Sequence, residues 1–287
     1  MLFRSPIAAA WDRYPYTENT RGSVTRQLSP RTIRDNASHW KVFADWAAEQ
    51  DLTALEDIRP EHVPLFSRYL RDRMTANRHN KIMFTCSVVC RLSGRPDHFA
   101  DSKRYRSEPV HRENLEPDEI RKVIDASSGE LRRLFIVAAF TGLRLGDCAT
   151  LQWSDIRIGA DGGRIIRKTG KTRKTVRFPI HPELLAELER TPPKERVGDM
   201  CPELAATYRH DPVRLSVMTR RVFESCGLTT RAKDKAGRAA TASVRGFHSF
   251  RHSFVTECAR GGVPLGLVKE WLGHSSPEIT RIYENWN

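Results

Sequence analysis

The sequence predicts a mainly α-helical protein with one small antiparallel sheet, divided into two domains. Apolar residues recur at helical spacing through residues 29–93, whereas the apolar period drops to two between residues 156 and 178. Between these regions, residues 94–112 are rich in glycine, proline and mixed charge, which is typical of a linker. At 287 residues the chain is long enough for two ordinary domains.

The charge of the chain indicates its class of partner. Lys and Arg number 48 against 35 Asp and Glu, a net charge of +13, which divides into +6 for residues 1–107 and +7 for the rest. Two basic halves are expected when both touch one polyanion. Six scattered cysteines without a CxxC pair are typical of reduced thiols in a cytosolic protein. No apolar run could span a membrane and no secretory signal is recognisable, so we expect a cytoplasmic protein with no membrane partner.

The first domain is predicted to be wholly helical over residues 29–93, after a flexible extension of residues 1–28. Ser29 is a suitable N-cap and Pro30 a suitable first helical residue. Further helices are expected within residues 59–73 and 75–92. Cys86 and Cys90 lie four apart on the last of these, where we expect an apolar packed pair.

The second domain is predicted to cover residues 113–287. Helices are expected within residues 116–127 and 131–143. Alternating apolar residues separated by glycine-rich turns then predict a three-stranded antiparallel sheet, with strands at residues 156–158, around 165 and at 176–178. Helices follow to the end of the chain, and one of them begins at Pro264 and stops at Gly273.

Basic residues gather in the predicted hairpin and on the outer faces of the first domain. Seven of them and no acid lie between Arg164 and Arg177, which fits either a solvated hairpin or one lying against DNA. The residues that we expect to contact DNA are Arg31, Arg34, Lys81, Arg164, Arg167, Lys168, Arg173 and Lys174.

Two short motifs contain further candidate site residues. Arg144 and Asp147 in "TGLRLGD" are three apart and can pair on one helix face, although an ordinary surface ion pair explains them equally well. His248 and Arg251 in "FHSFRHSF" lie one helical turn apart, and an arginine fork with a histidine donor suits a phosphate.

A metal site is the competing interpretation of the histidines. His248, His252 and His274 could chelate zinc, but no glutamate lies between the first two and no nearby carboxylate completes a known ligand pattern. We therefore expect no metal.

The C-terminal residues predict a short last helix. Ser276 is a plausible N-cap and Pro277 a first-turn residue, and the helix would carry Tyr283. Ile279, Ile282 and Trp286 form an apolar stripe that includes the tyrosine. Taken alone, packing against the core explains Tyr283 best.

Together these residues match the needs of metal-free phosphodiester transfer. Two arginines can neutralise the phosphate oxygens, a lysine can protonate the leaving 5′-oxygen, and a tyrosine oxygen can attack phosphorus. The order "TGLRLGD", "KTRKTVRFPI", "HSFRH", "WLGHSS" and "RIYE" resembles the tyrosine recombinase (phage integrase) family, in its two-domain, Xer-like form. The resemblance implies a helical core-binding (SAM-like) domain and a mixed α/β catalytic domain.

The resemblance also implies residue roles. Tyr283 matches the nucleophile that forms a 3′-phosphotyrosyl link, nine residues after His274, and Arg144 and Arg251 match the phosphate-clamping arginines. His248 and His274 match the histidines that bind the phosphate and assist proton transfer.

The hairpin lysine and the supporting carboxylate are less sharply defined by the resemblance. Lys171 matches the general-acid lysine best, since it lies eight residues before Pro179, with Lys168 and Lys174 as alternatives. Asp147 stands where the family commonly has a glutamate that supports the first arginine.

The implied activity is site-specific recombination of double-stranded DNA, by integration, excision or resolution, without a cofactor. The implied assembly is a homotetramer on two recombination sites that passes through a Holliday junction, nucleoid-associated in a prokaryotic host, with accessory DNA-bending or directionality proteins as further partners. Only four residues follow Tyr283, so we expect any exchange of a C-terminal helix between subunits to be reduced or replaced. The N-terminal extension is too short for an arm-site-binding domain.

Two other functions fit part of the pattern. A type IB topoisomerase uses the same cleavage chemistry, but the core-binding-like first half argues against it. A catalytically silent DNA-binding regulator would not need the full set of catalytic residues.

Overall fold

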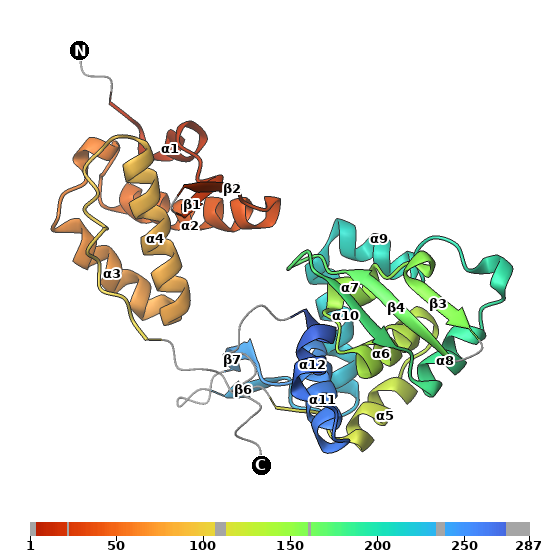
Figure 1. Cartoon of the computed structure of the whole chain (residues 1–287). Helices are drawn as coiled ribbons and strands as arrows, with labels where there is room; N and C mark the ends of the chain where they lie inside the picture. The colour runs from red at the N-terminus through yellow and green to blue at the C-terminus, as the bar shows by residue number, and fades with distance from the viewer. Residues whose placement is uncertain (1–3, 22, 107–112, 160–161, 234–238, 274–287) are drawn as a thin grey trace. The chain divides into compact units, whose positions relative to one another are not determined.

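The computed structural model describes residues 4–21, 23–106, 113–159, 162–233 and 239–273 (Figure 1). The chain divides into two compact units, residues 1–109 and residues 110–287. No helix in the described ranges is both long and apolar enough to cross a membrane. The elements of the first unit are α1 (Ile7–Arg13), β1 (Glu18–Arg21), β2 (Val24–Gln27), α2 (Pro30–Glu49), the 3₁₀-helix η1 (Leu55–Asp57), α3 (His62–Arg73) and α4 (Ala76–Leu92).

An aromatic cluster forms the core of the first unit. Phe43 is fully buried on α2 and packs edge-on against Phe66 of α3, with ring centroids 5.1 Å apart. Trp40 and Trp46 flank it along α2, one turn to either side. The predicted start of α2 is confirmed, because the Ser29 hydroxyl accepts a hydrogen bond from the backbone N–H of Thr32. Cys86 and Cys90 are both buried on α4, and burial raises the pKa of Cys90 to about 12.

The expected flexible extension was wrong for residues 4–21 and 23–28. Helix α1 packs into the core through Ile7 and Ala10, and the Ile7 carbonyl accepts a hydrogen bond from Trp40 Nε1 at 3.1 Å. The Ile7 N–H donates to the Thr53 carbonyl. Strands β1 and β2 form a short antiparallel hairpin. The stretch "IAAAW" is too short for its apolar period to be recognised in the sequence.

The predicted linker, residues 94–112, begins too early. Phe99 is 1% exposed in the core of the first unit, and the Asp97 carboxylate accepts a hydrogen bond from Ser87 of α4. Further along, Asn80 bonds both the N–H and the carbonyl of Tyr105. Residues 94–106 therefore belong to the first unit, although glycine, proline and mixed charge made them look like a linker.

The second unit combines helices with a three-stranded sheet and a small hairpin. Its first elements are α5 (Pro117–Asp125), α6 (Gly129–Thr141), α7 (Leu145–Ala149), the 3₁₀-helix η2 (Trp153–Asp155), β3 (Ile156–Gly159), β4 (Gly162–Lys168) and β5 (Thr175–Pro179). Then follow α8 (Pro182–Glu189), the 3₁₀-helix η3 (Pro193–Glu195), α9 (Pro202–His210), α10 (Pro212–Ser225), β6 (Arg231–Lys233), β7 (Ala239–Ser243), α11 (Phe247–Arg260) and α12 (Leu265–Leu272). The β6–β7 hairpin was not predicted.

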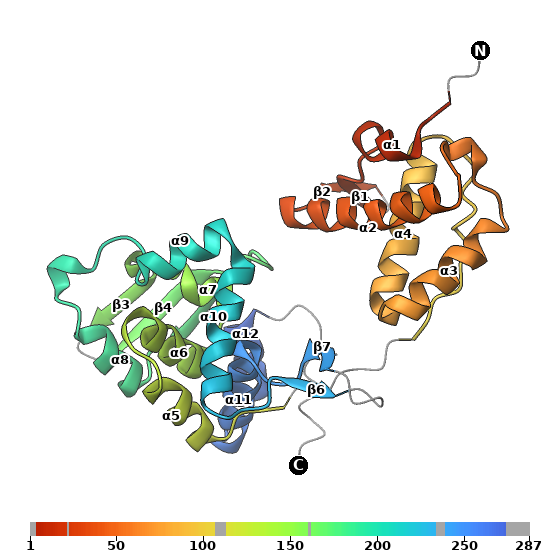
Figure 2. The same cartoon turned by 180° about the vertical axis from the view of Figure 1, so that it is seen from behind.

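The sheet is antiparallel in the order β3–β4–β5, as predicted. Ile156 pairs with Ile165, and Ile165 in turn with Phe178, so these apolar side chains share one face. That face packs on the main core of the unit, with α6 and α8 behind the sheet in Figure 1 and in front of it in Figure 2. The other face of the sheet carries the alternate residues.

Candidate active site

Arg251 is the buried centre of the candidate site. It lies on α11, is 3% exposed, and donates from Nη1 to the Gly142 carbonyl at 2.9 Å and from Nη2 to the Leu272 carbonyl at 2.8 Å. One guanidinium therefore joins the C-terminal ends of α6 and α12 to α11. Helix ends have spare carbonyls, and a cation is well placed to satisfy them.

Both helices end in a left-handed glycine. Gly142 has φ +59° and Gly273 has φ +63°. A Cβ on Gly142 would lie within 3.0 Å of Phe254 and Leu272 side-chain atoms, so close packing as well as backbone conformation requires glycine there. The stop of the last described helix at Gly273 confirms the sequence prediction.

Arg144 follows Gly142 by two residues and is the N-cap of α7 in an extended conformation. Its side chain is half-buried, and in the described part of the chain its buried Nη1 has no hydrogen-bond partner. A buried guanidinium nitrogen without a partner is costly in isolation, so its position suits an anionic ligand.

The predicted pairing of Arg144 with Asp147 was wrong. Arg144 is the N-cap of α7, and in the described structure it forms neither an ion pair nor a hydrogen bond with Asp147. The Asp147 carboxylate is 5% exposed and instead accepts a hydrogen bond from the backbone N–H of Gly170 at 2.7 Å. Asp147 thus holds the turn between β4 and β5.

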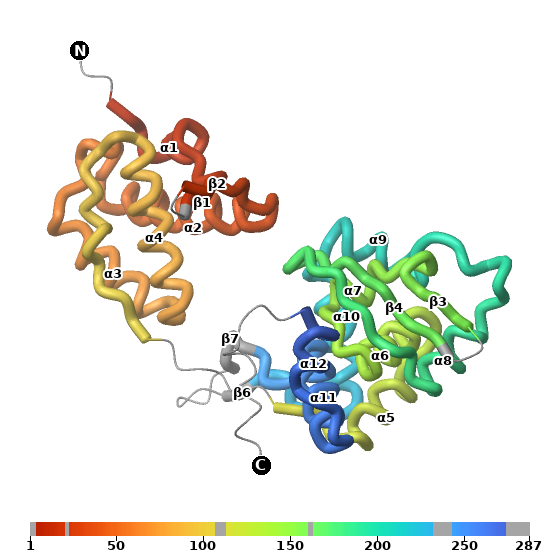
Figure 3. The backbone as a smooth tube through the Cα atoms, viewed as in Figure 1, coloured from red at the N-terminus to blue at the C-terminus, as the bar shows by residue number. Residues whose placement is uncertain are grey.

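That turn comprises residues 169–174 and has a well-defined hydrogen-bond pattern. The Thr169 N–H donates to the Lys174 carbonyl, and the Arg173 N–H donates to the Thr169 carbonyl, each at 2.9 Å. Arg173 takes a positive φ of +55° to close the turn. Figure 3 shows the β4–β5 hairpin continuing past β3 toward α7 and the end of α12.

The turn also contacts the end of α12. A Cβ on Gly273 would lie 3.2 Å from Val176 and within 4 Å of Thr172 and Lys174. The hairpin turn, the start of α7 and the ends of α6 and α12 therefore meet around Arg251. The structure brings together elements that lie more than one hundred residues apart in the chain.

The three candidate lysines occupy different positions on the hairpin. Lys168 is the last residue of β4, Lys171 lies in the turn directly after Gly170, and Lys174 immediately precedes β5. All three are exposed. Of the three, Lys171 is adjacent to the backbone group that Asp147 holds, whereas Lys174 lies at the far end of the turn.

His248 lies on α11 one turn before Arg251 and is exposed, whereas Arg251 is buried. Its ring packs edge-on against that of His252, with centroids 5.1 Å apart. Within the described ranges no group of three His, Cys, Asp or Glu side chains could hold a metal ion. His274 and Tyr283 lie outside the described residues.

Arg167 was misplaced among the exposed basic residues of the hairpin. Its Nη1 donates to Asp155 and its Nη2 to the Thr150 hydroxyl, each at 2.7 Å, on the inner side of the sheet. The parity of strand β4 explains the difference, because Arg167 shares the face of Ile165. By contrast, Arg164, Lys168 and Arg173 are exposed.

Gly146 and Tyr208 contribute to the site without having been predicted. A Cβ on Gly146 would lie 2.2 Å from the Tyr208 hydroxyl, so the α9 tyrosine packs directly on the α7 backbone between Arg144 and Asp147. The glycine in "RLGD" was the available signal, since a glycine inside a helix often marks close approach of another group.

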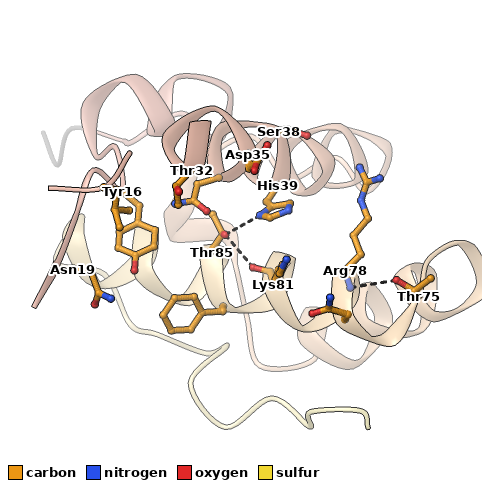
Figure 4. A pocket seen from close by; sticks show the side chains of 14 residues that line it. Tyr16, Asn19, Thr32, Asp35, Ser38, His39, Thr75, Arg78, Lys81 and Thr85 are labelled. Atoms are coloured by element: carbon orange, nitrogen blue, oxygen red, sulfur yellow. Dashed lines mark hydrogen bonds between the residues drawn. The ribbon is translucent and has the colours of Figure 1, made fainter. Parts of the chain in front are cut away.

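A second candidate surface lies in the first unit, in a groove between α2 and α4 (Figure 4). His39 and Thr85 face each other across it, with 3.4 Å between Nδ1 and Oγ1. Burial, together with the nearby Arg78 and Lys81, lowers the pKa of His39. Asn36 also lines the groove, and nothing in the described residues accepts a hydrogen bond from its buried Nδ2.

The predicted DNA contacts of the first unit lie on these helices. Lys81 lines the groove on α4, and Arg31 and Arg34 are exposed in the first two turns of α2. An unpartnered amide together with Arg78 and Lys81 in one groove can bind acceptor groups of a nucleic acid.

Comparison with known proteins places this geometry in a family. A model of the phage integrase family matches residues 113–287. The chain is 29% identical over 259 residues to the tyrosine recombinase XerA of Thermococcus kodakarensis, covering 89% of this chain and 84% of that protein. It is 30% identical over 193 residues to a XerC-like tyrosine recombinase of Caldanaerobacter subterraneus, where the match covers 58% of this chain and 49% of that protein. The match thus spans about half the length of the latter relative.

Solved structures share the fold. A lambda integrase dimer bound to a COC′ core site superposes with a TM-score of 0.67 at 20% identity, over 98% of this chain and 78% of that one. XerH recombinase bound to its difH substrate gives a TM-score of 0.60 at 20% identity, over 89% and 77%. With the family model covering more than half of the chain, this protein belongs to the phage integrase family of tyrosine recombinases.

Proposed function

We propose that the protein is a site-specific DNA recombinase that cleaves and rejoins strands through a 3′-phosphotyrosyl intermediate. The observation that carries this proposal is the junction at Arg251, which joins the ends of α6 and α12 and lies beside Arg144 and the β4–β5 turn, the motif regions that the structure describes. Arg144, with its unpartnered Nη1, lies at the same junction.

In the proposed reaction Arg144 and Arg251 hold the scissile phosphate, with His248 and His274 as further donors. The Tyr283 oxygen attacks phosphorus and gives its proton to one of these histidines, while the bond from phosphorus to the 5′-oxygen breaks. Lys171 supplies the proton that the leaving 5′-oxygen takes up. The second step reverses the first: a 5′-hydroxyl attacks phosphorus and the tyrosine leaves. The phosphodiester energy is retained in the covalent link, so the proposed chemistry uses neither a nucleotide nor a metal ion.

Lys171 is the proposed general acid because its neighbour Gly170 is fixed by Asp147. A fixed backbone next to the lysine limits the positions that its ammonium group can reach, which favours proton transfer to one oxygen. Lys168 and Lys174 remain the alternatives on the same hairpin.

The proposed partner is double-stranded DNA, bound by both units. The proposed contact with the recombination site is the α2–α4 groove of the first unit, which Lys81 lines, together with the exposed Arg31 and Arg34 of α2. Solved relatives are a lambda integrase tetramer bound to a Holliday junction and XerH bound to difH DNA. By analogy, we propose a homotetramer on two sites, with accessory DNA-bending or directionality proteins.

Covalent capture on nicked DNA tests the proposal. Wild-type protein is incubated with duplexes that carry a candidate site and a nick near the cleavage position, so that the released fragment diffuses away. We expect a protein–DNA band on a denaturing gel with wild type and none with Tyr283→Phe. An equal band with both proteins would exclude Tyr283 as the nucleophile.

The same reagents separate the two rival functions. Relaxation of supercoiled plasmid by low concentrations of protein, without site preference, would favour a type IB topoisomerase. Sequence-specific binding with no covalent band on the bound site would favour a silent regulator.

A further inference from the structure

The outer face of the three-stranded sheet carries arginines that the proposed chemistry does not use. Arg157 on β3 pairs directly with Arg164 on β4, and Arg177 on β5 pairs with Ile166. By strand parity all three arginines lie opposite to the buried Ile165 face, and all three are exposed. Lys168 continues the same face toward the hairpin turn.

The local charge on this face is uncompensated. Across the described ranges no carboxylate forms an ion pair with Arg157, Arg164 or Arg177, and none of the three side chains makes a hydrogen bond. The pairs that do form in this region, such as Arg167 with Asp155, lie on the inner face. Like charges directly opposite each other in a sheet are destabilising. A sheet face that keeps such a pair suits a polyanionic partner.

We propose that this face, formed by Arg157, Arg164, Lys168 and Arg177, is a second phosphate-binding surface that holds the DNA backbone beside the cleavage site. The inference rests on the proposed function, since it takes duplex DNA as the partner. It adds a binding surface on the opposite side of the sheet from the core, leading away from the hairpin turn that Asp147 fixes.

The dimensions of the face favour backbone contact over reading of bases. The major groove admits an α-helix or a two-stranded ribbon, whereas three strands at a spacing of about 4.8 Å with arginine side chains exceed its width. From Arg164 to Lys168 the strand rises about 13 Å, a length of duplex that presents roughly four phosphates per strand. Arginine forks bind phosphate oxygens in pairs.

The salt dependence of DNA binding tests this surface. The triple variant Arg157→Gln, Arg164→Gln and Arg177→Gln is titrated against a short duplex of mixed sequence, because phosphate contacts do not depend on sequence. We expect the slope of log K against log salt to become shallower by about 0.9 for each phosphate that is no longer neutralised, about 2.7 for three. The matched control is Arg121→Gln, Arg214→Gln and Arg221→Gln, which removes the same charge from exposed helical positions of the same unit. Its slope should equal that of wild type.

Three outcomes would overturn the inference. The first is a slope of the triple variant equal to that of wild type, and the second is an equal reduction in the control. The third is a lower thermal unfolding midpoint of the triple variant, because removal of repelling charges should leave stability unchanged or raise it. The single variant Arg157→Gln tests the same change in the salt slope with only one charge removed. Binding is measured without cleavage, so absence of a covalent band would count against the proposed function and leave this result standing.

Discussion

The two units of the chain depend on different kinds of contact: side-chain packing in the core of the first unit, and hydrogen bonds to backbone carbonyls at the candidate site of the second. In the first unit, side chains within helices carry the structure, and Phe43 packs against Phe66 from mid-helix positions. In the second, the candidate site lies at helix ends, where Arg251 bonds the carbonyls of Gly142 and Leu272. A core of side chains tolerates repacking, whereas a site built on backbone carbonyls and left-handed glycines has few acceptable substitutes.

The two arginines of the site give the largest expected contrast. Replacing Arg144 or Arg251 by lysine should each reduce covalent cleavage by roughly 10²–10³-fold, because a planar fork on the phosphate is lost. Arg251→Lys should also lower stability by about 2–4 kcal/mol, since one ammonium cannot bond both carbonyls. Arg144→Lys should leave stability nearly unchanged, as its Nη1 has no partner in the described structure. Cleavage rates and urea unfolding measure the two effects, and equal destabilisation by both variants would contradict the assigned difference.

A glycine with a left-handed backbone conformation in each unit allows a second comparison, of the stability cost of a glycine-to-alanine change. Gly142→Ala should cost about 2–4 kcal/mol, because a Cβ meets Phe254 and Leu272 in addition to the backbone strain at φ +59°. Gly94 in the first unit has φ +68° but nothing within 4 Å of a Cβ, so Gly94→Ala should cost only about 1 kcal/mol. Unfolding midpoints of the two variants measure the difference. If Gly94→Ala proves the costlier change, the close packing around Gly142 is not the deciding factor.

Asp147→Ala should reduce cleavage by roughly tenfold to a hundredfold, because the turn beside Lys171 loses the bond to Gly170. A substrate with a 5′-thio leaving group needs no proton from the lysine, so it should restore the rate of Asp147→Ala and of Lys171→Ala alike. Asp147→Asn retains an acceptor oxygen and serves as the control. Rescue of Lys171→Ala without rescue of Asp147→Ala would mean that Asp147 acts elsewhere, and failure to rescue Lys171→Ala would point to Lys168 or Lys174.

Trp40→Phe should destabilise the first unit by about 1 kcal/mol through loss of the hydrogen bond to the Ile7 carbonyl. A protein that begins after residue 13 should be destabilised further, since it also loses the burial of Ile7 and Ala10. Protection of α2 amides from hydrogen exchange measures both changes. Unchanged protection in the shortened protein would restore the expectation that this segment is a flexible extension.

His39 gives the smallest expected effect. Its pKa in the fold lies below the ordinary value of 6.5, so its stabilising neutral form is fully favoured above that value and stability is lost as pH falls through the folded pKa. His39→Gln should therefore flatten the fall in stability of the first unit on the acid side of pH 6.5. Thermal unfolding across that range checks the sign, and a steeper fall in the variant would contradict it.

Sequence patterns identified helices and strands well because periodicity and caps are local. Ser29, Pro30 and the alternation around Ile165 and Phe178 each predict a feature that the structure contains. The two errors in the first unit, at residues 4–21 with 23–28 and at residues 94–106, involve short segments whose order depends on the packing of Ile7 and Phe99 against distant helices.

The site itself was predictable in its residues but less so in its contacts. Arg251 and Arg144 were found by motif, yet nothing local indicates that Gly142 and Leu272 carbonyls accept from Arg251. The predicted partner of Asp147 was likewise wrong, because its carboxylate accepts from the Gly170 N–H, which lies close only in the folded chain. The face of Arg167 follows from the register of β4, which strand parity alone could have given.

The central claim is that the residues gathered around Arg251 hold a phosphate for attack by Tyr283. Its most direct test is to digest the covalent protein–DNA complex, formed in the presence of a chelator, and to identify the amino acid joined to DNA by mass spectrometry. We expect a single peptide that contains Tyr283 linked to a 3′-phosphate. A link through another residue, a 5′-phosphate link, or no complex unless a divalent metal is added would contradict the claim.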